Sequence, residues 1–245
     1  MSTLLLSLRL APVLVMTPVL SSMKLPASVK VLVVLGLSAM LVLGLPASAL
    51  VSFGVDWPRL ILAAISELLL GAALGFGLLC AFSSFSFGAR IIDAQAGFGV
   101  SQLFDPATRT QMPVLTSAFS LLAVLLFFVM DIHHTMMRGL YLVVERIPPG
   151  AAFDVSAAAP MVITQAGALF ALGFALVAPV VFWLLLVELG LSVLSRALPQ
   201  MNILLLGMPV RIAAAMLGLA LWLKYSSDVM AKVFITLLEG WSWLI

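Results

Sequence analysis

The chain has 245 residues, of which 64% are hydrophobic and only 9% are charged, and its formal net charge is +2. A soluble domain is typically about a quarter charged, so this composition argues against an ordinary soluble enzyme and indicates a membrane protein. The 12 basic residues stand singly and form no cluster, so we expect no nucleic-acid partner.

Long apolar runs predict an all-α, polytopic membrane-associated protein with about six long hydrophobic helices, arranged as hairpins with proline breaks. About 20 helical residues cross a hydrocarbon core about 30 Å thick. We expect these helices at roughly 4–22, 29–53, 60–89, 113–131, 158–195 and 201–224, followed by a short helix at 228–244. Pro179 lies within the longest run, and we expect the helix to kink or break there.

The first two predicted helices include a pattern that is similar to a secretory signal. Lys24 and Lys30 precede an apolar run that ends at Pro46-Ala47-Ser48-Ala49. We expect no cleavage, because the pattern begins late and the chain after it is equally apolar. Basic residues divide equally between alternate sides of the predicted helices, so their distribution does not orient the chain in a membrane.

The third predicted helix carries a charge and closely spaced glycines. Glu67 interrupts an apolar stretch and has no local partner. A charge at the centre of a bilayer costs roughly 2.5–3.5 kcal/mol, so Glu67 needs either a protein partner or a position at the headgroups. Gly71 and Gly75 form a G-x-x-x-G pattern, which lets two helices approach closely.

The end of the same helix alternates aromatic and small polar residues. Residues 82–88 read F-S-S-F-S-F-G, which fits either packing against neighbouring helices or the lining of a conduit. Arg90 and Asp93 are three residues apart and can pair on one helix face.

A polar, glycine-containing stretch then separates two apolar segments over residues 95–112. Gly97 and Gly99 permit backbone conformations that other residues resist, and Asp105-Pro106 favours a turn. A non-helical segment at membrane depth survives only where it is buried in protein or lines a cavity. The stretch therefore predicts a re-entrant or gating loop.

Candidate catalytic residues are few. Ser101 lies in the loop, and His133 and His134 follow Asp131 at the end of a predicted helix. Adjacent histidines are expected to project from different helix faces, which argues against a shared metal unless ligands from outside the pair take part. We therefore predict no catalytic residue, no cofactor and no metal site.

Two features of the second half bear on its organisation. The turn Ile147-Pro148-Pro149-Gly150, followed by an alanine-rich stretch, is the one candidate domain boundary. Glu188 ends another apolar run and, like Glu67, needs either a partner or a position at the headgroups.

Three stretches, in order and together spanning nearly the whole chain, resemble the FliR/SctT family of type III secretion export-gate proteins. The first is T-P-V-L at 17–20 with L-P at 25–26 and V-K at 29–30. The second is D-A-Q-A-G-F-G-V-S-Q-L-F-D-P at 93–106, followed by M-P-V-L at 112–115, where the flagellar branch fits better than the injectisome branch. The third is L-P-Q-M-N-I at 198–203, running to G-M-P at 207–209.

This resemblance implies a non-enzymatic subunit of the flagellar protein export gate in the bacterial inner membrane, at the flagellar basal body. Such a subunit would complete a ring of FliP-like and FliQ-like subunits and work with FlhB-like and FlhA-like export components on unfolded exported proteins. The chain would combine a FliP-like part at 1–150, including the gate loop, with a FliQ-like part and C-terminal helix at 155–245.

The resemblance also implies roles for individual residues. The loop would plug the channel, with apolar contacts from Phe98, Val100, Leu103 and Phe104. The plug residues would be Gly97, Phe98, Gly99, Val100, Ser101, Gln102, Leu103, Phe104, Asp105 and Pro106. Residues expected in inter-subunit or helix packing are Glu67, Gly71, Gly75, Arg90, Asp93, Glu188, Pro199, Gln200, Asn202, Gly207 and Pro209.

A secondary transporter is the alternative that the residues leave open. It would use a discontinuous helix at 95–110 and a coupling carboxylate at Glu67, Asp93 or Glu188. A carrier of that kind is expected to show two repeated halves with paired broken segments, and the sequence shows no such pairing.

Overall fold

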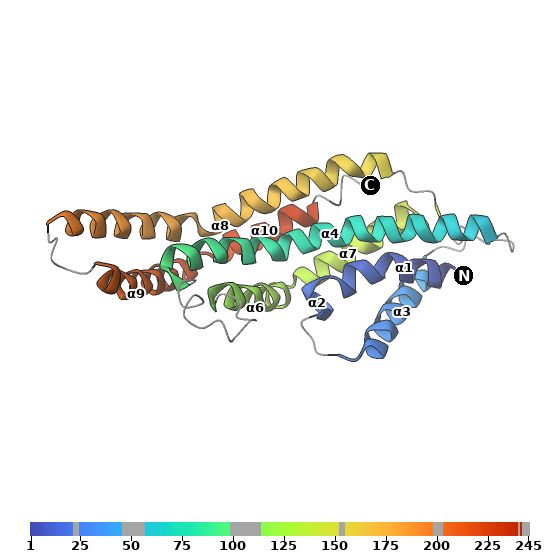
Figure 1. Ribbon diagram of the computed structural model, residues 1–245. Helices are drawn as coiled ribbons and strands as arrows, with labels where there is room; N and C mark the ends of the chain where they lie inside the picture. Colours follow the sequence, from blue (N-terminus) through green and yellow to red (C-terminus); the bar gives the residue numbers. More distant parts are fainter. Residues whose placement is uncertain are drawn as a thin grey trace, which may run out of the picture. The chain divides into compact units, whose positions relative to one another are not determined.

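The computed structural model describes residues 1–21, 25–45, 57–98, 114–151, 155–197, 203–239 and 241 (Figure 1). These residues form helices and turns, and no strand occurs among them. The predicted fold class, an all-α polytopic membrane protein, is confirmed for this part of the chain.

The helices follow the predicted apolar runs closely. In chain order they are α1 (Ser2–Val15), α2 (Pro18–Ser21), α3 (Ala27–Leu43), α4 (Trp57–Ala96), α6 (Val114–Val129), α7 (Ile132–Arg146), α8 (Val155–Ala197), α9 (Ile203–Leu223) and α10 (Ser227–Glu239). Pro18 opens α2 and Pro26 caps α3, positions where a missing backbone N–H costs little.

Helix α7 was not predicted from the sequence. Its buried side chains are Ile132, Met136, Leu140, Val143 and Val144, which recur at helical spacing along one face. The opposite face is polar, so the segment contains no long apolar run. A search for membrane-length runs overlooks such an amphipathic helix, whereas a search for helical periodicity would have found it.

Pro179 was expected to kink or break the longest run, and the break does not occur. Helix α8 continues from Val155 to Ala197 as one helix. A proline inside a helix costs about 3 kcal/mol, because it removes one backbone hydrogen bond and crowds the preceding turn. Pro179 is exposed, and the kink stays a prediction.

Two described helices are long and apolar enough to cross a membrane, Trp57–Ala96 and Val162–Ala197. Two further pairs pass the same test only together, because each is bent: α6 with α7 by 70°, and α9 with α10 by 74°. By length and composition the described chain therefore offers two spans, or up to four if each bent pair is one span.

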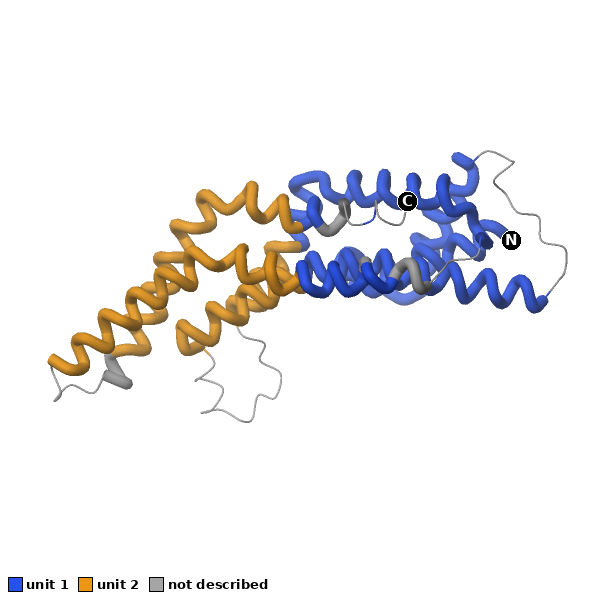
Figure 2. The backbone as a smooth tube through the Cα atoms, turned by 90° about the horizontal axis from the view of Figure 1, so that it is seen from above, with its two compact units in different colours: residues 1–82, 124–168, 234–245 blue, residues 83–123, 169–233 orange. Residues whose placement is uncertain are grey.

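The chain divides by contact into two compact units (Figure 2). Unit 1 comprises 1–82, 124–168 and 234–245, and unit 2 comprises 83–123 and 169–233. The predicted division at residue 150 rests on resemblance to two kinds of subunit and not on contacts within one chain. It therefore stays a prediction.

Unit 1 has an aromatic core where three helices meet. Phe82 of α4 lies 5.4 Å from Phe127 of α6 and 5.2 Å from Phe234 of α10, measured between ring centroids. All three rings are at most 4% exposed.

Unit 2 is held together by close helix contacts. Gly88 of α4 and Gly173 of α8 lie where the two helices approach closely. A Cβ on Gly88 would collide with the backbone of Gly173, and a Cβ on Gly173 would collide with the backbone of Ser84. Phe87 and Phe170 pack edge to face beside them, with centroids 5.1 Å apart. The phenylalanine- and serine-rich segment thus packs against helices in the structure, with Phe82 in unit 1 and the remainder in unit 2.

Candidate functional site

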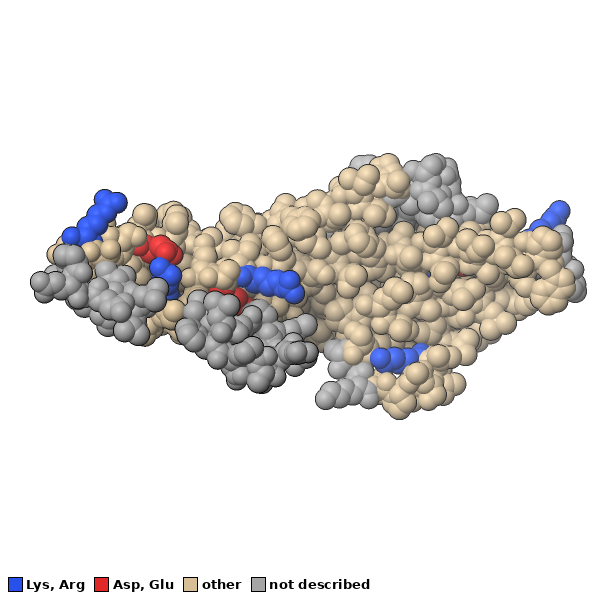
Figure 3. Space-filling model, viewed as in Figure 1, with Lys and Arg blue, Asp and Glu red and all other residues tan. Residues whose placement is uncertain are grey.

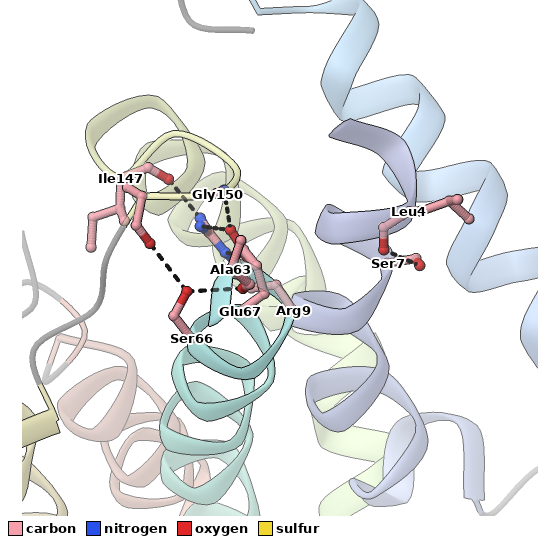
Figure 4. Close-up of polar contacts among 9 residues, drawn as sticks. Leu4, Ser7, Arg9, Ala63, Ser66, Glu67, Ile147 and Gly150 are labelled. Atoms are coloured by element: carbon pink, nitrogen blue, oxygen red, sulfur yellow. Dashed lines mark hydrogen bonds and ion pairs between the residues drawn. The ribbon is translucent and has the colours of Figure 1, made fainter. Parts of the chain in front are cut away.

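A buried ion pair joins Arg9 of α1 to Glu67 of α4 in unit 1 (Figure 4). Arg9 Nε and Nη2 donate to Glu67 Oε2 and Oε1 at 2.6 and 2.9 Å. Both side chains are 1% exposed. Two parallel hydrogen bonds between charged groups make this the strong, bidentate form of an arginine–carboxylate pair.

The turn that follows α7 completes the pair. Arg9 Nη1 donates to the carbonyl oxygen of Ile147 at 2.8 Å, and the N–H of Gly150 donates to Glu67 Oε1 at 2.7 Å (Figure 4). Gly150 has φ 90°, in the left-handed region that favours glycine. Three contributors, α1, α4 and the Pro-Pro-Gly turn, therefore meet at one satisfied charge pair.

Arg9 was missed in the sequence analysis. The sequence left Glu67 either a protein partner or a position at the headgroups, and the partner that the structure gives it, Arg9, lies 58 residues earlier in the chain. The available signal was that Arg9 is the one charged residue within an otherwise apolar helix.

The two glycines of the G-x-x-x-G pattern let α1 and α4 touch at the backbone. A Cβ on Gly71 would overlap the carbonyl group of Arg9. A Cβ on Gly75 would lie 3.0 Å from the carbonyl oxygen of Pro12. This close approach brings Arg9 within reach of Glu67, one helical turn before Gly71.

A second buried anchor lies in unit 2, at the end of α4. The Asp93 carboxylate accepts hydrogen bonds from the backbone N–H of Leu115 at 3.2 Å and from the N–H and Oγ1 of Thr116 at 2.9 and 2.8 Å. The first N–H groups of a helix have no partner inside it, and their positive partial charge attracts a carboxylate. Asp93 therefore caps α6 from a different helix.

Two serines extend this contact between α4 and α6. Ser120 Oγ donates to the carbonyl oxygen of Thr116 at 2.8 Å and lies 2.9 Å from Ser86 Oγ. Arg90 is exposed and makes no ion pair with Asp93, although their spacing allowed one. The carboxylate instead meets three donors of α6, an arrangement that helical spacing could not reveal.

The predicted gate loop begins where α4 ends. Gly97 follows the helix with φ 83°, the left-handed conformation that commonly terminates helices. Phe98 is half-buried. The remaining predicted plug residues, Gly99 to Pro106, lie outside the described residues.

Glu188 also has a partner, on the neighbouring helix. Arg211 Nη2 of α9 lies 2.7 Å from Glu188 Oε1 of α8, with the side chains 35% and 47% exposed. Of the other residues predicted to pack, Gly207 is buried and Pro209 lies exposed within α9. Pro199, Gln200 and Asn202 fall outside the described residues.

Adjacent histidines were expected to share no metal without ligands from outside the pair, and at the bend between α6 and α7 the structure places Asp131 beside them. His133 and His134 have ring centroids 4.1 Å apart. One ligand atom each from Asp131, His133 and His134 lies within 4.8 Å of the others. Asp131 has φ 55°, so the chain here departs from the regular helix on which the expectation was based.

Comparison with known proteins gives a consistent picture. Residues 1–237 match the family described as bacterial export proteins, family 1. The chain is 31% identical over 206 residues to the flagellar biosynthetic protein FliR of Escherichia coli (strain K12), covering 83% of this chain and 77% of that protein. It is 29% identical over 181 residues to the flagellar biosynthetic protein FliR of Bacillus subtilis (strain 168), covering 73% and 70%.

The chain is also similar to a protein whose name refers to translocation and not to the flagellum. The Yop proteins translocation protein T of Yersinia pestis is 26% identical over 193 residues, covering 78% of this chain and 74% of that protein.

Proposed function

The chain belongs to the bacterial export proteins, family 1, and from that premise we propose that it is a non-enzymatic subunit of the flagellar type III protein export gate. It completes a ring with FliP-like and FliQ-like subunits in the bacterial inner membrane, at the flagellar basal body. FlhB-like and FlhA-like export components work beside it, and its substrates are unfolded flagellar proteins. The observation that carries the proposal is the family match, which runs from residue 1 through the loop to residue 237.

Exposed apolar surface supports an assembled state. Within Val162–Ala197 of α8, only 28% of an 18-residue apolar stretch is buried within the chain. Phe174, Phe182 and Val193 of this helix are 51%, 61% and 70% exposed. Few charged side chains interrupt the face seen in Figure 3. Such a surface needs either lipid or apolar protein against it, and both are available to a subunit of a membrane-embedded ring.

We propose that the predicted gate loop forms the plug of the gate over residues 97–112, since Gln95 and Ala96 belong to the end of α4. The Asp93 anchor supports this assignment, because it fixes the end of α4 to the start of α6 on either side of the loop. A loop whose two ends are fixed keeps its apolar residues in one region while its middle changes conformation. Residues 1–150 then act as the FliP-like part and residues 155–245 as the FliQ-like part.

The transporter alternative is disfavoured by the state of its three candidate carboxylates. Glu67 is paired with Arg9, Asp93 with the start of α6, and Glu188 with Arg211. A coupling carboxylate has to exchange its ion or proton during the cycle, whereas the first two of these are buried and fully engaged.

The native mass of the tagged chain, extracted in mild detergent from its own cells, tests the proposal. We expect one copy of the chain together with several copies each of two smaller helical membrane proteins. A lone monomer or a homodimer would contradict the ring-completing role. As a control, the tag is moved from this chain to one of the smaller proteins, and the same mass should be recovered. This shows whether a tag on this chain causes the loss of partners.

A further inference from the structure

The bend between α6 and α7 gathers three side chains that metals commonly use as ligands. Asp131, His133 and His134 each place one ligand atom within 4.8 Å of the other two. The two histidines are the only ones in the chain. His133 and His134 are neighbours in the first turn of α7, and Asp131 joins them from the bend just before the helix.

The backbone at Asp131 explains why its carboxylate is available. Asp131 is the N-cap residue of α7, a position where an aspartate usually accepts a hydrogen bond from the N–H two or three residues later. Here it has φ 55° and makes no such capping bond. Its Oδ1 instead lies 3.4 Å from His134 Nδ1, with both side chains more than 70% exposed.

His133 adds a ring that its surroundings hold in place. It packs against Phe128 with ring centroids 5.4 Å apart and lies 6.4 Å from Phe127. Its Nδ1 is buried and has no hydrogen-bond partner in the structure. A buried nitrogen without a hydrogen-bond partner costs free energy. The protein therefore leaves this imidazole free to act as a metal ligand.

We propose that Asp131, His133 and His134 bind a divalent transition-metal ion of the zinc class. Two imidazole nitrogens and one carboxylate oxygen suit Zn²⁺, Co²⁺ or Ni²⁺ better than Mg²⁺ or Ca²⁺, which prefer oxygen ligands. Three protein ligands leave a fourth position open to water or to a further ligand. This inference is independent of the proposed export function.

Bound metal would join the residue at the bend to the first turn of α7. The 70° angle between α6 and α7 would then be fixed by coordination as well as by packing. The three ligands lie within four consecutive residues, so the unfolded chain also keeps them near one another. Binding then stabilises the folded state only by as much as the bend pre-arranges the ligands. The readout is therefore both metal uptake and thermal stability.

The test uses the full chain in detergent micelles, purified through an affinity tag that contains no histidine. Zinc uptake is followed by titration calorimetry, and coordination is followed by the visible absorption of added Co²⁺. We expect one zinc ion per chain and a higher melting temperature with zinc than without it. His134→Gln and Asp131→Asn should each weaken zinc binding at least about tenfold. Removing a residue that only hydrogen-bonds to a metal ligand already weakens binding by about that factor, and removing the ligand itself should weaken it no less.

Glu145→Gln is the matched control, because Glu145 is exposed on the same helix and the change removes the same charge. It should leave zinc binding unchanged. Melting temperatures without metal show whether each variant folds, and His133→Gln serves as a second ligand variant if Asp131→Asn unfolds. Absence of zinc uptake by the unaltered chain, or uptake that His134→Gln and Asp131→Asn leave intact, would overturn the site.

Discussion

At the scale of single residues, the Arg9–Glu67 pair shows how a charge is kept inside a very apolar chain. Removing two charges from water costs several kcal/mol each, and attraction repays this only when the remaining donors and acceptors are also satisfied. Here Ile147 and Gly150 supply those extra partners. The pair is therefore sensitive to the loss of either member.

Glu67→Ala should lower the free energy of unfolding by about 3–5 kcal/mol, because it leaves the Arg9 guanidinium buried without its counter-charge. The double variant Arg9→Met with Glu67→Leu should recover most of that loss, since apolar side chains of similar volume often replace a buried pair at little cost. Thermal unfolding in detergent measures both. If the double variant were less stable than Glu67→Ala, the unpaired Arg9 charge would not be the cause of the loss, and this explanation would be wrong.

Glu188→Ala is the control for that experiment. Its partner Arg211 is 35% exposed, so water can solvate the guanidinium when the carboxylate is removed. A pair of this kind contributes about 0–1 kcal/mol. The two substitutions remove the same side chain and differ chiefly in burial, so a large loss for Glu67→Ala alone assigns the effect to burial.

At the scale of elements, the connection from α4 to α6 is the part of the chain that the export proposal depends on most. Its ends are joined by Asp93 and extended by the contact between Ser86 and Ser120. The proposed seal consists of apolar side chains between those ends. Seal and anchor can therefore be altered separately.

Deleting residues 99–104 should make the assembled gate leaky to small ions, because the apolar contacts that close the channel are lost. Replacing the same six residues with glycine and serine should also cause leakage, since it keeps the length of the connection and removes only its apolar side chains. Ion conductance of cells that express the complete gate is the measurement. Ser101→Ala, which leaves the apolar residues in place, should stay tight, and unchanged conductance in the deletion would count against the plug.

At the scale of the whole molecule, a large apolar surface remains after the chain has folded. Helix α3 buries only Val34 and Ser38, and its Leu32, Met40 and Leu43 are 67%, 73% and 87% exposed. In unit 2, Phe174 and Phe182 of α8 are also exposed, at 51% and 61%. An exposed apolar surface of this size contacts either lipid or another protein. An experiment that separates these two contacts therefore tests whether the chain is a subunit of an assembly.

A photo-reactive amino acid at Phe174 or Val193 should therefore form cross-links to other gate proteins in cells. The same amino acid at Leu74 or Phe85, both 0% exposed, should give cross-links only within the chain. Mass spectrometry of the adducts identifies the partners. If the α8 positions react only with lipid, this face borders the membrane and the partners bind elsewhere.

Much of the fold followed from the sequence. The positions of the apolar helices depend on composition and run length, which are local properties, and the limits of α6, α8 and α9 lie close to the predicted segments. The predicted limits fail elsewhere: α4 continues beyond residue 89 to Ala96, α3 ends at Leu43 and not at residue 53, and the predicted segment 4–22 is divided into α1 and α2. The amphipathic α7 was not foreseen, because it depends on which side of the helix is covered, and the length of an apolar run does not report this.

The sequence by itself determined the class of the protein and indicated close helix packing at Gly71 and Gly75, and it left Glu67 and Glu188 either a protein partner or a position at the headgroups. Only the tertiary structure decided what those partners are. Arg9 reaches Glu67 across 58 residues, and Asp93 reaches Thr116 across 23. The physical reason is that a helix fixes contacts three or four residues apart, whereas pairing over longer separations is set by where helices cross.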